Sequence, residues 1–148
     1  MSNKSCTFAG HSTAPDTLKS ELIAAVTDLI KNKSVTTFYV GNHGRFDALS
    51  ASAVRAVKQS YKDICLILVV PKMSSNIENN EEYYSDMYDE ILIPAESDAA
   101  HYKAMITVRN RWMVDNSDYI ITYIRREHGG AYNTYKYAKK QNISIISL

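Results

Sequence analysis

Strand-like and helix-like stretches alternate along the whole sequence. Short runs rich in β-branched and aromatic residues predict six strands, and longer stretches with apolar residues at helical spacing separate them. The run ICLILVV at 64–70 is apolar throughout, which is typical of a parallel strand buried on both faces. This alternation predicts an α/β domain with a single Rossmann-like, doubly wound, mainly parallel sheet and helices on both faces. The expected strands are 5–9, 35–40, 64–70, 91–94, 118–124 and 143–148.

The first two helices are predicted from apolar spacing and from capping residues. Pro15 suits a first helical turn, with Ser12 or Thr13 as the N-cap, and Asp47 is predicted to cap the second helix. The apolar faces of these two helices are expected to contain Leu18, Leu22, Val26 and Leu29, and Leu49, Ala53, Ala56 and Val57.

The pattern is weaker in the second half of the chain. Residues 72–90 are polar, acidic and rich in tyrosine, and we expect a loop with at most one helical turn. Its tyrosines, Tyr83, Tyr84 and Tyr88, can be solvated, close over a base or form an oligomer contact. Later helices are expected at about 98–116 and 131–141.

Length and composition favour one globular domain, spanning 1–148. The formal net charge of +1 offers no bulk electrostatic attraction to nucleic acid or to an anionic membrane, so neither is expected as a partner. Both cysteines, Cys6 and Cys65, fall in apolar runs, which predicts buried free thiols in a reducing compartment. We therefore expect a cytoplasmic protein.

Glycines and polar residues stand where the predicted strands end. Gly10-His11 follows the first strand, 41–47 (GNHGRFD) follows the second, and Gly129-Gly130 precedes the last helix. In open α/β sheets, ligands bind outside the carboxyl ends of the strands. Two interpretations stay open: βα turns need glycine, or free backbone N–H groups at helix N-termini hold a phosphate.

The helix at 98–116 presents a second polar feature. Arg109 shares a helical stripe with Met105 and Met113, which directs its guanidinium towards a cleft. There it would suit a phosphate or carboxylate; the alternative is an arginine whose head reaches bulk water.

Several motifs resemble those of one known superfamily. They are F-A-G-H at 8–11, G-x-x-G-x-x-D at 41–47, R-N-R-W-M-V-D-x-S-D at 109–118, G-G-A-x-x-T at 129–134 and Y-A-K-K at 137–140. In order and over nearly the whole chain, they resemble the SLOG superfamily, specifically its YpsA-like branch, a relative of the DprA and LOG proteins. The resemblance implies a Rossmann-like domain that binds nucleotides or nucleotide-derived ligands. It places ligand contacts at Gly10, His11, Gly41, Asn42, His43, Gly44, Arg45, Asp47, Arg109, Asn110, Gly129, Gly130, Ala131 and Thr134.

The chain departs from the enzymatic LOG pattern at the last motif. Lys136 stands where that pattern has a glutamate, and a lysine cannot stabilise a developing oxocarbenium ion or orient water as a carboxylate does. Glu127, just before the Gly129-Gly130 turn, is a weaker candidate for the role of the missing glutamate. Ala131 replaces the threonine usual in the YpsA-like branch, with Thr134 one turn further on.

The four histidines lack metal-ligand spacing, so we predict no metal and no catalytic residue.

Three functions stay open after these observations. The preferred one is non-catalytic binding, as a sensor or sequestering protein, of a nucleotide-derived signalling ligand of the NAD, ADP-ribose or cyclic-nucleotide type, with no further cofactor required. The alternative is an N-glycosidic hydrolase or transferase acting on nucleoside monophosphates, and a third is a DprA-like role in association with DNA or proteins. A homo-oligomer, a dimer or higher, is expected.

Overall fold

A single six-stranded sheet organises the computed structural model, which describes residues 3–148. Each neighbouring pair of strands is parallel, in the order β4-β3-β2-β1-β5-β6, so the predicted doubly wound parallel sheet is confirmed. The predicted domain bounds also include residues 1 and 2, which lie outside the described residues. The strands are β1 (Lys4–Gly10), β2 (Val35–Val40), β3 (Cys65–Val69), β4 (Glu90–Leu92), β5 (Tyr119–Tyr123) and β6 (Ser144–Ser147).

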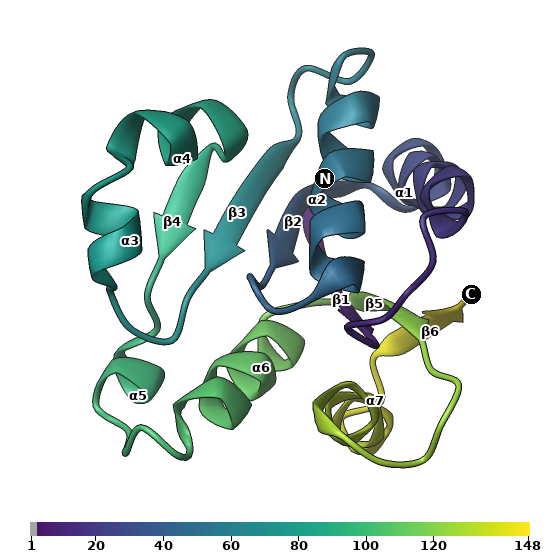
Figure 1. The fold of residues 1–148 in the computed structure, drawn as a ribbon. Coiled ribbons are helices and arrows are strands. Elements are labelled where there is room, and N and C mark those ends of the chain that lie inside the picture. The colour runs from purple at the N-terminus through teal and green to yellow at the C-terminus, as the bar shows by residue number, and fades with distance from the viewer. Residues whose placement is uncertain (1–2) are drawn as a thin grey trace.

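Helices cover both faces of this sheet (Figure 1). Successive strand residues point to opposite faces, so Phe8 packs in the large core cluster with α1 and α2, while Ala9 packs with Val114 and Ala138 of α6 and α7. Within the described residues, no helix has both the length and the apolar character required to cross a membrane. The helices are α1 (Leu18–Lys33), α2 (Arg45–Lys58), α3 (Ser75–Glu78), α4 (Glu81–Met87), α5 (Ala95–Asp98), α6 (Met105–Asp115) and α7 (Gly130–Lys140).

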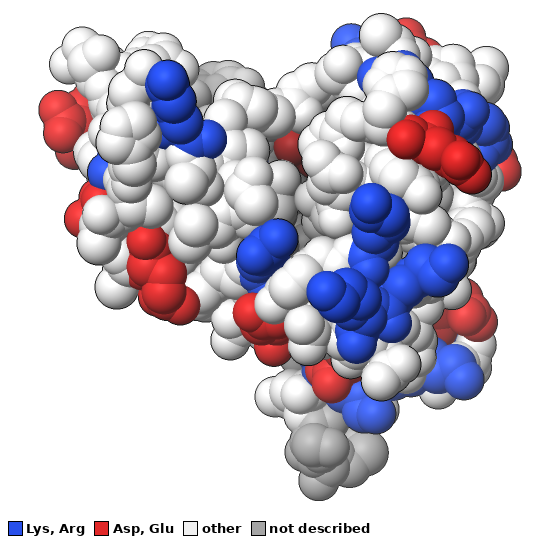
Figure 2. Space-filling model, turned by 90° about the horizontal axis from the view of Figure 1, so that it is seen from below, with Lys and Arg blue, Asp and Glu red and all other residues white. Residues whose placement is uncertain are grey.

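The order of the strands defines where a ligand can bind. From β1 to β4 the chain moves steadily outward in one direction, and β5 then returns to pair with the other side of β1. In such sheets a crevice opens at the carboxyl ends of the two strands that flank the reversal, here β1 and β5. β2, β3 and β4 point downward in Figure 1, so Figure 2 looks onto this carboxyl edge of the sheet.

Two predicted helix caps are wrong. The first helix begins at Leu18, after a turn, so neither Ser12 nor Thr13 caps it. The second helix begins at Arg45, with Gly44 as its N-cap at a φ of 88°. The reason is a close approach of two loops: a Cβ on Gly44 would lie 2.7 Å from the Cα of Ser12, and the Arg45 N–H donates to the Ser12 carbonyl at 3.0 Å.

The first two helices bury nearly the predicted apolar faces. Leu18, Leu22, Val26 and Leu29 are all buried, whereas Ala56 of α2 is exposed. Phe46 and Val54 belong to the buried face of α2 instead, so this face begins in the first turn of the helix. Phe46 closes the end of this face against Gly10 of β1.

The acidic segment and the helix after it also differ from expectation. Residues 72–90 form the two short helices α3 and α4, and the Oγ of Ser74 accepts a hydrogen bond from the Ile77 N–H at 3.4 Å. The helix predicted at about 98–116 is observed as the shorter α6, which begins only at Met105, and the separate short helix α5 precedes it at Ala95–Asp98. The buried Ser97 hydroxyl donates to the carbonyl of Pro71 at 2.9 Å, which attaches α5 to the segment that follows β3.

The two cysteines are free thiols in unequal environments. Cys6 is fully buried in the core, while Cys65 at the start of β3 is only half-buried. Burial raises the pKa of both thiols, so both stay protonated at neutral pH.

Two glycines at the carboxyl edge are predicted to respond oppositely to alanine. A Cβ at Gly10 would lie 2.3 Å from the buried ring of Phe46, so Gly10→Ala should lower the free energy of unfolding by about 1–3 kcal/mol. Gly130 has no atom within 4 Å of that position, and Gly130→Ala should leave stability unchanged or raise it by about 0.4–1 kcal/mol. Urea denaturation of both variants checks this pair, and equal effects would contradict the packing at Gly10.

Candidate functional site

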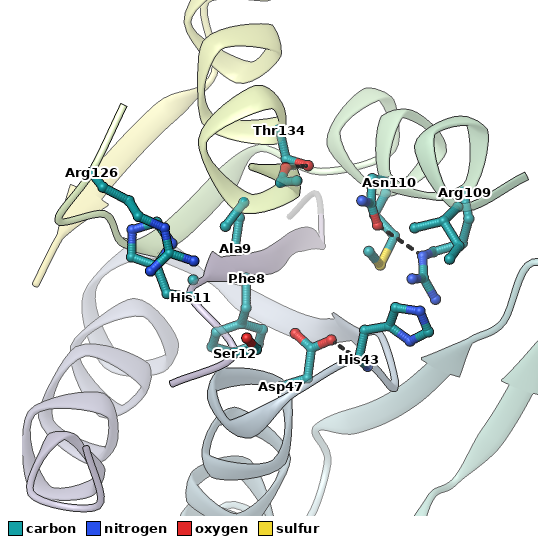
Figure 3. A pocket seen from close by; sticks show the side chains of 15 residues that line it. Phe8, Ala9, His11, Ser12, His43, Asp47, Arg109, Asn110, Arg126 and Thr134 are labelled. Carbon is teal, nitrogen blue, oxygen red and sulfur yellow. Dashed lines mark hydrogen bonds between the residues drawn. The ribbon is translucent and has the colours of Figure 1, made fainter. Parts of the chain in front are cut away.

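A cleft of about 200 Å³ opens at the carboxyl ends of β1 and β5 (Figure 3). It lies at the crevice that the strand order predicts. Four segments contribute to it: the end of β1, the loop before α2, one side of α6, and the start of α7 with the loop that precedes it. The residues that line it are Phe8, Ala9, Gly10, His11, Ser12, His43, Asp47, Ile106, Arg109, Asn110, Met113, Arg126, Gly130, Ala131 and Thr134.

His11 joins the ends of the two central strands. Its backbone N–H donates to the Tyr123 carbonyl at 3.3 Å, and its Nε2 accepts from the backbone N–H of Arg125 at 2.8 Å. The side chain is 3% exposed, and burial, followed by the nearby Arg126, lowers the pKa of His11, which keeps the ring neutral. The neutral ring thereby holds the β5–α7 loop in place beside β1.

The 41–47 loop is arranged around Gly41 and Asp47. The Asp47 Oδ2 accepts a hydrogen bond from the His43 N–H at 2.9 Å (Figure 3), which closes the first turn of α2 on the loop. A Cβ on Gly41 would lie 2.9 Å from that Oδ2 and 3.3 Å from the Cζ of Arg109. Only glycine therefore fits between the carboxylate and the guanidinium.

Arg109 is almost completely enclosed, at 1% exposure. Its guanidinium donates to three neutral oxygens: Nε to the Oδ1 of Asn110 at 2.8 Å, and Nη1 to the Val69 carbonyl at 2.8 Å and to the Oδ1 of Asn42 at 3.3 Å. Burial lowers the pKa of Arg109, an effect that the Asp47 carboxylate opposes. Arg109 thus bonds α6 to the end of β3 and to the 41–47 loop.

Asp47 carries the only carboxylate among the residues that line the cleft. Burial raises its pKa to about 6, although the hydrogen bond from His43 and the charge of Arg109 act in the opposite direction. Burial and, secondarily, Arg109 also lower the pKa of His43. Above about pH 6 the Asp47 carboxylate is mostly ionised and offsets the charge of the buried Arg109, so this side of the cleft approaches neutrality only as the pH rises past 6.

The start of α7 lacks such a carboxylate. Gly129 is its N-cap at a φ of 96°, and no acidic residue occurs in its first turn. Neither Gly129 nor Gly130 has an atom within 4 Å of its Cβ position, so the backbone there is open to a ligand. The Thr134 hydroxyl, which lines the cleft, donates to the Gly130 carbonyl at 3.0 Å and stabilises the helix itself. A helix N-terminus with accessible backbone N–H groups and no nearby carboxylate attracts anions.

Several polar groups in the cleft form no hydrogen bond with any described residue, and the Arg126 guanidinium and the Asn110 amide nitrogen are two of them. The Arg126 guanidinium is exposed and, among residues 3–148, has neither a hydrogen bond nor an ion pair. The amide nitrogen of Asn110 is similarly free within those residues, because only its Oδ1 is bonded to Arg109. They lie on opposite sides of the cleft (Figure 3), and each can donate to an anion that enters it.

Most of the predicted site residues meet in this one cleft, but some do not. Asn42, Gly44 and Gly129 do not line it, and Gly41 lies behind Asp47 and Arg109. Arg45 is directed away from the cleft, where its Nε donates to the Oδ1 of Asp16 at 2.7 Å.

The residues considered for LOG-type chemistry also lie elsewhere. Lys136 is exposed, with its ammonium 5.2 Å from the centre of the Tyr132 ring, and does not line the cleft. Glu127 lines a neighbouring hollow instead. Within the described residues, no three His, Cys, Asp or Glu side chains are grouped as metal ligands.

Ser12 and Arg126 also line the cleft, although neither was predicted from the sequence as a site residue. A signal for each was present. Ser12 follows Gly10-His11, and Arg126 follows the predicted strand at 118–124, so both stand just beyond the end of a central strand, where ligands bind in this class of sheet.

Comparison with known proteins identifies the fold. No family model and no curated protein matches the sequence. DNA processing protein A from Helicobacter pylori, solved to explain its single-stranded DNA binding mode, is similar in structure with a TM-score of 0.70 at 17% sequence identity. DNA processing protein A (DprA) from Streptococcus pneumoniae is similar with a TM-score of 0.71 at 11% identity. Each comparison covers 97% of this chain, but only 64% and 50% of the two longer proteins. The chain therefore has the Rossmann-like α/β fold found in DprA proteins.

The prediction that nucleic acid is not a partner is wrong. It was based on the net charge of +1, but this fold also occurs in a protein described by its binding of single-stranded DNA. A net charge sums over the whole surface, whereas binding depends on local charge. Figure 2 shows Lys and Arg side chains gathered on the carboxyl-edge face, on the side where α7 lies.

Arg109→Ala is predicted to destabilise the fold. The change leaves the buried Val69 carbonyl without its donor and removes a fully packed side chain, so the free energy of unfolding should fall by about 2–4 kcal/mol. Arg111→Ala is the matched control on the same helix: its exposed guanidinium only stacks on Tyr137 at 5.0 Å, and a loss below about 1 kcal/mol is expected. Comparable losses in guanidinium chloride denaturation would show that Arg109 has no special structural role.

Asp47 should make stability depend on pH. Its pKa of about 6 in the folded state exceeds its ordinary value of 3.8, so the folded protein binds more protons than the unfolded chain between about pH 4 and 6. Stability from this group is therefore greatest at low pH and falls by about 3 kcal/mol as the pH rises through 6. Asp47→Asn should remove this fall when urea denaturation is repeated from pH 4 to 7. Parallel pH profiles for the two proteins would refute the burial effect.

Proposed function

We propose that the chain binds the phosphate backbone of single-stranded nucleic acid at the cleft between the ends of β1 and β5, and that the natural ligand is DNA. One observation carries the proposal. The Arg126 guanidinium, which has no partner among residues 3–148, lines the same cleft as the N-terminus of α7, whose first turn has no acidic residue. This proposal includes membership of the SLOG superfamily, whose DprA proteins share the fold.

The donors on the α7 side suit a phosphate. Arg126 supplies a charged fork that can hold two phosphate oxygens, and the Asn110 amide adds a neutral donor from the facing helix. The first turn of α7 contributes backbone N–H groups and the positive end of the helix dipole, without a competing carboxylate. Arg109 is held in place by bonds from its Nε and Nη1 to Asn110, Val69 and Asn42, so among its nitrogens only Nη2 is left to donate to a ligand.

The size of the cleft favours a strand over a ligand that is completely enclosed. Pockets that enclose a drug-sized molecule usually measure about 300–1,000 Å³. The cleft measures about 200 Å³, which suits one phosphate and its sugar. A nucleic-acid strand places one such unit in the cleft while its neighbours extend over the surface.

Binding of a free nucleotide-derived ligand, the preferred function from the sequence, is the second candidate. The convergence of Arg126, Asn110 and Gly130 on one small cleft supports it, since a terminal phosphate would meet the same donors. A non-catalytic sensing or sequestering role for an NAD-, ADP-ribose- or cyclic-nucleotide-type molecule would then apply. Competition experiments separate the two candidates, because a strand binds through several phosphates and a free nucleotide only through its own.

Fluorescence anisotropy with a labelled oligothymidine of about 16 nucleotides tests the proposal. We expect saturable binding that weakens steeply between about 50 and 200 mM salt, because each neutralised phosphate releases counterions. A duplex of equal length should bind less well, and AMP or ADP-ribose should compete only at a large excess. Displacement at equimolar ADP-ribose would favour the second candidate, and no binding at low salt would refute strand binding.

Arg126→Ala is predicted to weaken oligothymidine binding by about 1.5–3 kcal/mol, or about 10- to 150-fold in Kd, as expected for loss of a charged hydrogen bond. Lys31→Ala removes an equal charge from the exposed end of α1, at the opposite edge of the sheet, and should leave Kd unchanged at fixed salt. An equal effect of both substitutions in the anisotropy assay would indicate general charge attraction and contradict a specific role for Arg126.

A further inference from the structure

A second hollow of about 420 Å³ adjoins the cleft on the outer side of α7. The two cavities share Arg126, which lines both. The hollow is the larger of the two, and none of the functions considered from the sequence uses it. Its lining residues are Thr122, Ile124, Arg125, Arg126, Glu127, Tyr132, Tyr135, Ser147 and Leu148.

Helical spacing separates the two cavities along α7. Gly130, Ala131 and Thr134 face the cleft, while Tyr132 and Tyr135, three residues apart, face the hollow. A chain that leaves the cleft past Arg126 therefore reaches the tyrosines by crossing the first turn of α7. The order along this path is cleft, guanidinium, aromatic rings.

The tyrosines form a surface on which flat rings can stack. The Tyr132 and Tyr135 ring centres lie 6.2 Å apart with their planes tilted by 33°, and both side chains are half-buried. A lysine ammonium accompanies each ring: Lys136 at 5.2 Å from the centre of Tyr132 and Lys139 at 5.4 Å from that of Tyr135. Both rings thus remain partly accessible, with a cation close to each.

The charges around the hollow select for an anionic partner. Arg125 is held over the Tyr123 ring at 4.2 Å, and its Nη1 donates to the Leu148 carbonyl at 2.9 Å, so it supplies a fixed charge. Arg126 supplies a second charge that is free to bond, and the carboxylate of Glu127 is the one acidic side chain in the lining. With the two lysines beside the rings, cations outnumber this carboxylate.

We propose that the hollow stacks bases of the same nucleic-acid strand whose phosphate occupies the cleft, so that the strand runs from the cleft across Arg126 onto Tyr132 and Tyr135. This inference rests on the proposed function. Aromatic rings combined with cations that follow a backbone are the combination by which proteins bind single strands without reading their sequence. The site should therefore accept any base and discriminate poorly between them.

The test compares an oligothymidine of about 16 nucleotides with an abasic deoxyribose-phosphate oligomer of equal length. Tyr132→Ala combined with Tyr135→Ala should weaken oligothymidine binding about 5- to 150-fold, the range expected for one stacked base, and leave the abasic oligomer unaffected. Arg126→Ala should weaken binding of both. In the same assay, 2-aminopurine within the oligonucleotide should be quenched by the unmodified protein and not by the double-tyrosine variant.

Tyr83→Ala combined with Tyr102→Ala is the matched control, because it removes two exposed tyrosines at 57% and 66% exposure that do not line the hollow. Circular dichroism and thermal unfolding establish that each variant is folded. Equal oligothymidine affinity of the unmodified protein and a folded double-tyrosine variant would overturn the stacking site while leaving cleft binding intact. Failure of the unmodified protein to bind either oligomer would overturn the proposed function and, with it, the stacking site.

Discussion

The enclosed guanidinium of Arg109 is the interaction on which the geometry of the carboxyl edge depends. A buried cation is costly unless it is hydrogen-bonded, and here the Nε and Nη1 of Arg109 donate to three oxygens from separate segments while Asp47 lies nearby. The end of β3, the 41–47 loop and α6 are thereby fixed relative to one another. Gly41 lies between the Asp47 carboxylate and the Arg109 guanidinium, so the loop can pass there only with a residue that has no side chain. The cleft inherits its shape from this arrangement.

Sequence patterns were sufficient for the sheet and for much of the site, because both follow from local periodicity and from where strands end. All six strands were expected close to their observed positions, and the residues around Gly10, Asp47, Asn110 and Thr134 do meet. The errors arose where distant segments decide the local structure. Gly44, not Asp47, caps α2 because that loop packs against Ser12, a contact absent from the local pattern.

The charges of this protein are unevenly distributed, so its net charge says little about which partners it can bind. Eight of the 16 acidic residues lie in residues 78–98, the segment that contains α4, β4 and α5 at one end of the sheet (Figure 1), whereas the first turn of α7 has none. A net charge of +1 is thus the sum of regions with opposite character. At close range, within about a Debye length of 8–10 Å, a ligand responds to the nearby region and not to the sum.

The hydrogen bond from the Arg125 N–H to His11 has a consequence for rates of association. It fixes the loop that carries Arg126 to the end of β1 before any ligand arrives, so that only the Arg126 side chain needs to become ordered. Because this loop is already in place, no slow loop closure is needed between the first contact with the ligand and its binding. Association should then be limited by diffusion and accelerated by opposite charge, as for proteins that dock without conformational change.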